Sequence, residues 1–284
     1  MAPVTVRWWP APAKLNLMLR ITGRRADGYH DLQTVFQLLD HGDRLAFEVR
    51  EDGLIRKLNP PPGVPEDNGL AVRAARLLQQ ATGTPLGADI RLDKRLPLGG
   101  GVGGGSSDAA TTLVALNHLW GTGLDEDRLA QLGRQLGADV PVFVRGHSAW
   151  AEGVGERLTP LDLPGRWYVV ACPPVHVITA ELFADPNLER NLPRITLADF
   201  MDGEHANVFE PVVVKRHPVI AEALDRLRPH GEPHLTGTGA CVFCACADED
   251  AARRALDALP AEWMGFIARG VSVSPLKACL AAGS

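Results

Sequence analysis

The sequence lacks an apolar run of the roughly 20 residues that a membrane-spanning helix needs. Its longest apolar stretch, residues 167–180, is short and is interrupted by two consecutive prolines. Charged residues and prolines, including Arg7 and Pro10, occupy the N-terminal segment where a signal peptide has its apolar core. We therefore expect a cytoplasmic protein.

The chain also lacks a large excess of charge of either sign. The chain has 29 Lys and Arg residues against 34 Asp and Glu residues, and its formal net charge is -5. This balance gives no positive field with which to hold nucleic acid or a membrane surface. We expect the partner to be a small molecule, and the sequence leaves the oligomeric state open.

Cysteine is rare, with five residues in the chain, and three of them lie close together at Cys241, Cys244 and Cys246. The Cys-x-x-Cys spacing is typical of half a zinc site, but no second pair of cysteines or histidines accompanies it. The stretch also alternates like a strand, which places Cys241 and Cys244 on opposite faces. We therefore predict small apolar core residues here and assign no metal ligands.

Glycine, in contrast, is concentrated in "PLGGGVGGGSSDAA", residues 97–110, where six glycines occupy seven positions. A strand pattern at 88–96 precedes the loop, and a helical pattern with Ser106 or Ser107 as cap follows it and ends at Gly121. A flexible linker would not be framed so closely by regular structure. The unpaired N–H groups at such a helix start form a binding place for phosphate.

The remaining pattern mixes strands and helices, which predicts an α+β fold with two lobes and a cleft between them. The composition shifts to Pro, Gly and Leu near residue 160, so we expect an N-terminal domain at 1–160 and a C-terminal domain at 161–284. Expected strands lie at 5–9, 14–21, 35–39, 44–50, 138–146, 167–171, 239–247 and 266–273. Expected helices lie at 69–80, at 126–136 after the cap Asp125, and at 219–227 and 249–258.

Two common nucleotide motifs fit the loop poorly. The Walker A pattern is absent because no lysine precedes Ser106. The dinucleotide pattern G-x-G-x-x-G matches at Gly99, Gly101 and Gly104, but that fold also needs a second parallel strand ending in an acidic residue. A second helix follows here instead, so a dehydrogenase is disfavoured.

The glycine loop resembles the phosphate loop of the GHMP kinases, the superfamily of galactokinase, homoserine kinase and mevalonate kinase. Residues 12–43 resemble the opening segment of the branch that acts on 4-diphosphocytidyl-2-C-methyl-D-erythritol. "EDNGLAVRAARLL" from Glu66, "GADVPVFV" from Gly137 and "LTGTGACVF" from Leu235 are further matches. They follow the family order from end to end.

The resemblance implies a two-lobed GHMP kinase fold, with an N-terminal ribosomal-protein-S5-like lobe and a C-terminal ferredoxin-like lobe. It implies ATP-dependent phosphorylation of the 2-hydroxyl group of the CDP-linked methylerythritol, a step of the methylerythritol phosphate pathway to isoprenoid precursors. Mg²⁺ is expected to arrive with ATP, with Ser107 near it, and we assign no dedicated protein site for the cation.

The resemblance also implies roles for individual residues. Asp139 is expected to accept the proton of the substrate hydroxyl, and Lys14 to orient that carboxylate and neutralise charge near the γ-phosphate. The implied substrate-binding residues are Asn16, Tyr29, His30, Thr179 and Phe183, with the two aromatic rings on either side of the cytosine base. The implied ATP-binding residues are Asn68, Pro97, Leu98, Gly99, Gly100, Gly101, Val102, Gly103, Gly104, Gly105, Ser106 and Ser107.

Two alternative functions remain open at this stage. A kinase of the same fold for another alcohol, such as homoserine or mevalonate, would have no use for the aromatic motif "DGYHDL" and Phe183. A nucleotide-binding module without catalysis would not need both Lys14 and Asp139. Taken singly, Lys14 and Asp139 are more often ordinary surface charges, and Phe183 is more often a core residue.

Overall fold

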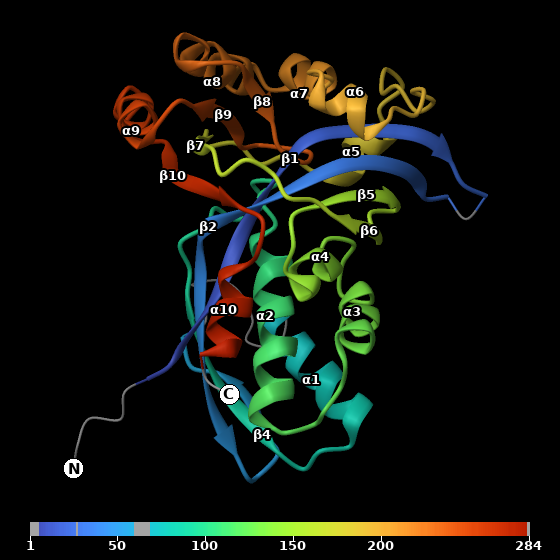
Figure 1. Ribbon diagram of the computed structural model, residues 1–284, viewed down its shortest axis with the longest axis vertical. Coiled ribbons are helices and arrows are strands. Elements are labelled where there is room, and N and C mark those ends of the chain that lie inside the picture. Colours follow the sequence, from blue (N-terminus) through green and yellow to red (C-terminus); the bar gives the residue numbers. More distant parts are fainter. Residues whose placement is uncertain (1–5, 27, 60–68, 283–284) are drawn as a thin grey trace.

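The computed structural model describes residues 6–26, 28–59 and 69–282, which form two lobes joined by two long strands (Figure 1). These are β1 (Trp8–Arg24) and β2 (His30–Arg50), which pair antiparallel along nearly their whole length. The sequence pattern predicted two shorter strands in each segment, and this was wrong. Among the described strands β1 pairs with β2 alone, so its prolines lie in an edge strand, and Pro12 also borders a register shift between Pro12 and Lys14.

The lower lobe is built on the continuation of these strands. β4 (Gly87–Asp93) pairs antiparallel with β2, and the short β3 (Ile55–Lys57) pairs parallel with β4. Two helices, α1 (Leu70–Thr82) and α2 (Gly104–Leu119), share one hydrophobic core with these strands. Because α2 is made largely of small and apolar residues that are buried on several sides, it forms the centre of this lobe.

A strand was expected at residues 138–146, but the segment forms the short helix α4 (Val140–Arg145). A short apolar run that is buried throughout has no periodicity that separates strand from helix. Pro141 fits the first turn of the helix, and Gly146 ends it with a left-handed backbone conformation. The preceding helix α3 (Glu126–Arg134) begins after its predicted cap, Asp125, whose side chain accepts from the backbone N–H of Arg128.

The upper lobe continues the same sheet in the order β2-β10-β7-β9-β8. The bounds of its strands are β7 (Trp167–Cys172), β8 (Pro233–Leu235), β9 (Val242–Cys246) and β10 (Met264–Val271). Its helices α8 (Pro218–Leu227) and α9 (Glu249–Asp257) contribute to one core with the strands, as their apolar spacing predicts.

Several short elements had no clear pattern in the sequence. They are β5 (Ala149–Gly153), β6 (Arg157–Pro160), α5 (Thr179–Ala184), α6 (Leu197–Met201), α7 (Glu210–Arg216), a 3-10 turn (Arg228–His230) and α10 (Pro275–Ala281). The helix α10 returns to the lower lobe, where Leu276 is buried in its core (Figure 1). The domain division after residue 160 stays a prediction.

The cysteines lie on both faces of the upper sheet. Cys244 and Cys246 are buried on the face covered by the helices, as expected for core residues, and Cys241 lies on the opposite face. The expectation for Cys241 was incomplete, because a disulfide joins it to Cys172. Among the described residues, no group of three or more His, Cys, Asp or Glu residues is placed to hold a metal ion. In the same part of the chain, no helix is both long and apolar enough to span a bilayer.

Candidate active site

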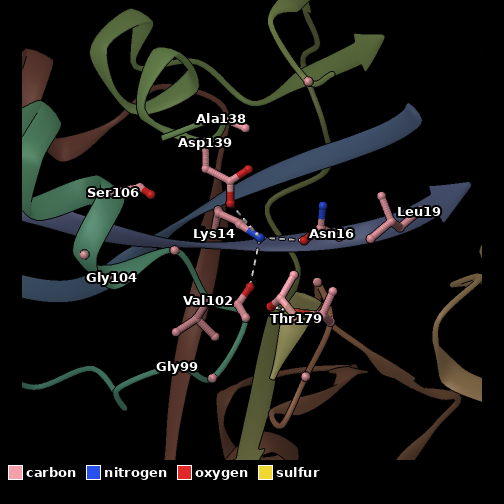
Figure 2. Close-up of a pocket in the computed structure, with 18 of the residues that line it drawn as sticks. Lys14, Asn16, Leu19, Gly99, Val102, Gly104, Ser106, Ala138, Asp139 and Thr179 are labelled. Carbon is pink, nitrogen blue, oxygen red and sulfur yellow. Dashed lines mark hydrogen bonds and ion pairs between the residues drawn. The ribbon is translucent and has the colours of Figure 1, made fainter. Parts of the chain in front are cut away.

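A cavity of about 520 Å³ lies between the two lobes. Its walls come from the paired strands β1 and β2, from the glycine loop, from the start of α4 and from the turn after β8. Figure 2 shows Lys14, Asn16, Asp139, Ser106 and Thr179 gathered around it. Segments that are far apart in the sequence therefore meet in one place.

The glycine loop leads directly into α2, as the sequence predicted. The residue at the helix start is Gly103, which has a φ of 76°, so neither Ser106 nor Ser107 is the cap. Both serines lie within the first turn instead, and no described side chain caps the helix. Its first N–H groups are left for a ligand, and the helix dipole adds positive potential at this end.

The glycines are needed because the loop packs closely against the protein as well as lining the cavity. A Cβ atom on Gly103 would lie 2.7 Å from the ring of Phe143 and 3.1 Å from Cγ of Lys14. A Cβ atom on Gly101 would collide with the backbone carbonyl of Thr236. Side chains at these positions would push the loop away from the strand that carries Lys14.

Lys14 and Asp139 form the centre of the site. The Lys14 side chain is 3% exposed, and its Nζ lies 3.3 Å from Oδ2 of Asp139, whose side chain is 33% exposed (Figure 2). Nζ also donates to Oδ1 of Asn16 at 2.6 Å and to the carbonyl oxygen of Gly101 at 2.8 Å. The ammonium group is therefore fixed by three oxygen partners, while the carboxylate keeps access to the cavity.

Asn16 links this centre to the surrounding backbone. Its Nδ2 donates to the hydroxyl of Thr34 at 2.8 Å, and that hydroxyl donates to the carbonyl oxygen of Met18. The backbone N–H of Asn16 donates to the hydroxyl of Thr236 at 3.0 Å. The sequence predicted a substrate contact for Asn16, and the structure gives it a direct contact with Lys14 as well.

Of the residues predicted to bind the cytidine, Phe183 and Thr179 line the cavity, whereas Tyr29 and His30 do not, and the rings are arranged differently from the expected sandwich. Phe183 lines the cavity, and the ring stacked on it is that of His30, at a centroid distance of 5.0 Å. Tyr29 is 65% exposed. Thr179 lines the cavity, and its hydroxyl lies 2.8 Å from that of Thr238.

His30 has an unused hydrogen-bonding atom. Its Nε2 is buried and has no hydrogen-bond partner among the described residues. Burial lowers the pKa of His30, and the nearby Arg190 and Arg24 lower it further. A neutral imidazole can donate from one nitrogen and accept at the other, but Nε2 reaches a ligand in the cavity only if the ring turns.

Lys94 was not identified from the sequence, although it stands just before the glycine loop. Its Nζ lines the cavity wall and contacts Oδ2 of Asp43 at 2.5 Å and Oδ2 of Asp108 at 3.0 Å. Burial raises the pKa of Asp108 to about 7, although the positive charge of Lys94 acts to lower it. Burial acts to lower the pKa of Lys94, but the carboxylates of Asp43 and Asp108 raise it by more, so the pKa of Lys94 is raised. The sequence feature that could have identified Lys94 is its position between a predicted strand and the glycine loop.

The remaining predicted residues fall into three groups. Residues 97–106, from Pro97 to Ser106, all line the cavity. Ser107 is fully buried, does not line the cavity, and its hydroxyl has no partner among the described residues. Asn68 lies outside the described residues.

The sequence also gave no role to Thr34 and Thr236, although Thr236 lies inside the quoted motif "LTGTGACVF".

The arrangement is suited to the transfer of a phosphoryl group to an alcohol. An open helix start can hold phosphate oxygens, a lysine can compensate their charge, and a carboxylate can accept a hydroxyl proton. Such a transfer needs positioning and electrostatic compensation more than covalent participation by the protein.

Comparison with known proteins agrees with this geometry. Residues 69–147 match the GHMP kinases N terminal domain, and residues 188–264 match the GHMP kinases C terminal domain. The chain is 57% identical over 94% of its length to a 4-diphosphocytidyl-2-C-methyl-D-erythritol kinase of Pseudomonas paraeruginosa, and 95% of that relative is covered. It is 55% identical to the enzyme of the same name from Halorhodospira halophila, over 96% of each chain.

A solved structure of a 4-(cytidine 5'-diphospho)-2C-methyl-D-erythritol kinase superimposes with a TM-score of 0.82 and 37% identity. The match covers 93% of this chain and 99% of that one. The two-lobed α+β GHMP kinase fold predicted from the sequence is thus confirmed. The chain belongs to the 4-diphosphocytidyl-2-C-methyl-D-erythritol kinases, within the GHMP kinase superfamily.

Proposed function

We propose that this chain transfers the γ-phosphoryl group of ATP to the 2-hydroxyl group of 4-diphosphocytidyl-2-C-methyl-D-erythritol. The observation that carries the assignment of roles is the contact between Lys14 and Asp139 beside the open start of α2. The acceptor hydroxyl enters between the carboxylate and the bound phosphates. ADP and the phosphorylated alcohol leave.

Asp139 is the general base of this proposal. It lies at the N-terminus of α4, where its side chain makes no capping hydrogen bond, so the carboxylate is available to the hydroxyl. Lys14 holds that carboxylate in place and offsets the negative charge that accumulates as the phosphoryl group moves. Because Lys14 is itself fixed by Asn16 and Gly101, little reorganisation is needed during the reaction.

The triphosphate of ATP binds along the glycine loop, with its terminal phosphates at the first N–H groups of α2. Mg²⁺ carried by ATP would neutralise phosphate charge. Ser106 and Asp139 are the side-chain oxygen donors beside the helix start, and they fit a cation that keeps most of its ligands as water and phosphate oxygens. Ser107 is too deeply buried for the role expected from the sequence.

The cytidine end of the acceptor binds at Phe183 and His30. The stacked His30 and Phe183 rings offer an aromatic surface, and a rotation of the His30 ring would bring its unpaired Nε2, which is buried in this structure, to the polar edge of the base. Tyr29 precedes His30 in the chain and is exposed, and in this proposal its ring stacks on the other face of the base.

A direct test measures ADP release by the purified chain with ATP and each of three acceptors: the CDP-linked methylerythritol, mevalonate and homoserine. We expect turnover only with the first. We also expect CDP, but not GDP, to compete with that acceptor, because a purine would leave the His30 edge unpaired.

The variant Phe183→Ala should weaken binding of the acceptor by about tenfold to a hundredfold while the Kd of ATP stays constant. Phe47→Ala, a change at another partly buried phenylalanine far from the cavity, serves as the matched control. Faster turnover of mevalonate or homoserine, or equal competition by CDP and GDP, would contradict the proposed acceptor.

A further inference from the structure

A second cavity, of about 270 Å³, lies on the reverse side of the strands that form the active site. Leu17 of β1 and Gln37 of β2 line it, whereas their neighbours Asn16 and Phe36 line the active-site cavity. Successive side chains of a strand point to opposite faces, so the same two strands separate the two cavities. The remaining walls come from β7, β8, β9 and α6 in the upper lobe (Figure 1).

Five aromatic rings form a continuous arc along this cavity. Tyr168 and Phe243 lie 6.0 Å apart between ring centroids, and Phe243 and His234 lie 5.8 Å apart. His234 and His205 follow at 6.0 Å, and His205 and Phe200 at 4.9 Å. All five residues line the cavity, which makes its wall suited to a flat aromatic ligand.

The hydroxyl of Tyr168 is the polar group at one end of this arc. Tyr168 is 3% exposed, and within the described part of the chain its hydroxyl has no hydrogen-bond partner. Burial raises the pKa of Tyr168 to about 12, so the hydroxyl stays protonated and can donate. A hydroxyl that donates to no described protein group can donate to a ligand in the cavity that it lines.

Arg166 supplies positive charge to the same cavity. It lines the same cavity, and its charge acts on the pKa of Tyr168, which it lowers. Arg166 forms no ion pair with any described residue. A single carboxylate is therefore able to accept from the Tyr168 hydroxyl and from the guanidinium group together.

We propose that this cavity is a second binding site, specific for a small aromatic carboxylate. The ring of the ligand lies against the aromatic arc, and its carboxylate binds Arg166 and the hydroxyl of Tyr168. Glu232 also lines the cavity and disfavours a second negative charge, so a monoanion binds better than an aryl phosphate. The volume is just below the usual range of about 300–1,000 Å³ for ligand pockets, which suits one or two fused rings.

Calorimetric titration with 2-naphthoate tests this site on the full chain. A nonhydrolysable ATP analogue and CDP are kept at saturating concentration, so that binding in the active site does not contribute. We expect 2-naphthoate to bind, and 2-naphthamide and 2-naphthyl phosphate, which have the same ring, to bind at least about tenfold more weakly.

Variants then locate the binding. Tyr168→Phe and Arg166→Gln should each weaken 2-naphthoate about tenfold or more, and Glu232→Gln should tighten it. Met201→Trp should block the cavity, whereas Met264→Trp makes the same change at another exposed methionine that does not line it and should leave binding unchanged. Thermal unfolding of each variant confirms that it is folded.

Either of two kinds of result would overturn the proposal. One is the absence of 2-naphthoate binding to the unmodified chain up to the solubility limit of the probe. The other is binding that survives Met201→Trp, or that is equally tight for the carboxylate and the amide, since either would place the ligand elsewhere or show that its charge is not recognised.

Discussion

The Nζ atom of Lys14 and the carboxylate of Asp139 lie 3.3 Å apart, although one residue belongs to the first strand and the other to the start of α4. Lys14 is nearly inaccessible to solvent, and its position is set by Asn16 and by the glycine loop. The geometry therefore couples the phosphate loop and the proposed base through one ammonium group. The following predictions test this coupling and the buried charges around it.

Asp139→Asn should remove most turnover and leave ATP binding nearly intact. The amide has the shape of the carboxylate but cannot accept the proton, and a positioned general base contributes about 10²–10⁴ in rate. The measurement is kcat together with the Kd of ATP. Asp257→Asn, at an exposed aspartate of α9, is the control. Full activity of Asp139→Asn would rule out the role of a base.

Thr34→Val should lower kcat by about five- to tenfold without changing the KM of ATP. The substitution keeps the shape of the side chain but removes the acceptor for Nδ2 of Asn16, so the amide that holds Lys14 becomes free to rotate. Thr34→Ser keeps the hydroxyl and should restore the rate. An unchanged kcat in Thr34→Val would show that this hydrogen bond has no part in positioning Lys14.

Gly103→Ala should weaken ATP binding by more than tenfold, because its Cβ would press on Phe143 and on Lys14 at the start of α2. Gly121→Ala is a matched control: this glycine also has positive φ, but a Cβ there meets no atom within 4 Å. Both changes carry a backbone strain of about 1–2 kcal/mol, seen as lower stability in urea. Equal effects of the two variants on ATP binding would argue against a specific role of the contact.

Asp108→Asn should flatten the pH dependence of stability between pH 4 and pH 7. The pKa of Asp108 is raised by burial from 3.8 in the unfolded chain to about 7, so the folded state binds the extra proton in this window. Stability of the unmodified chain therefore falls as the pH rises through this window, by at most about 1.4 kcal/mol per pH unit from this group, and is constant above it.

The free energy of unfolding, measured by urea titration at several pH values, gives the difference between the variant and the unmodified chain. Relative to the unmodified chain, the Asp108→Asn variant should become progressively more stable from pH 4 to pH 7. Asp257→Asn should show no such trend. A constant difference for Asp108→Asn across this range would mean that Asp108 is ionised throughout.

The sequence by itself determined the features that depend on neighbouring residues. The glycine run between a strand and a helix, the cap Asp125, and the apolar spacing of the upper helices all involve residues within a few turns of one another. Their preferences are set by local backbone geometry and side-chain periodicity, which act wherever the segment is placed. The ordered motifs also identified the family.

Tertiary structure alone decided the features that depend on contacts between distant segments. Residues 140–145 form a helix where a strand was expected, because their apolar side chains are buried throughout and their pattern does not separate strand from helix. Lys94 joins the site because Asp43 and Asp108 meet it there, and Thr34 because it faces Asn16 across a strand pair. Such contacts form only when packing brings the segments together, so no local pattern in the chain contains them.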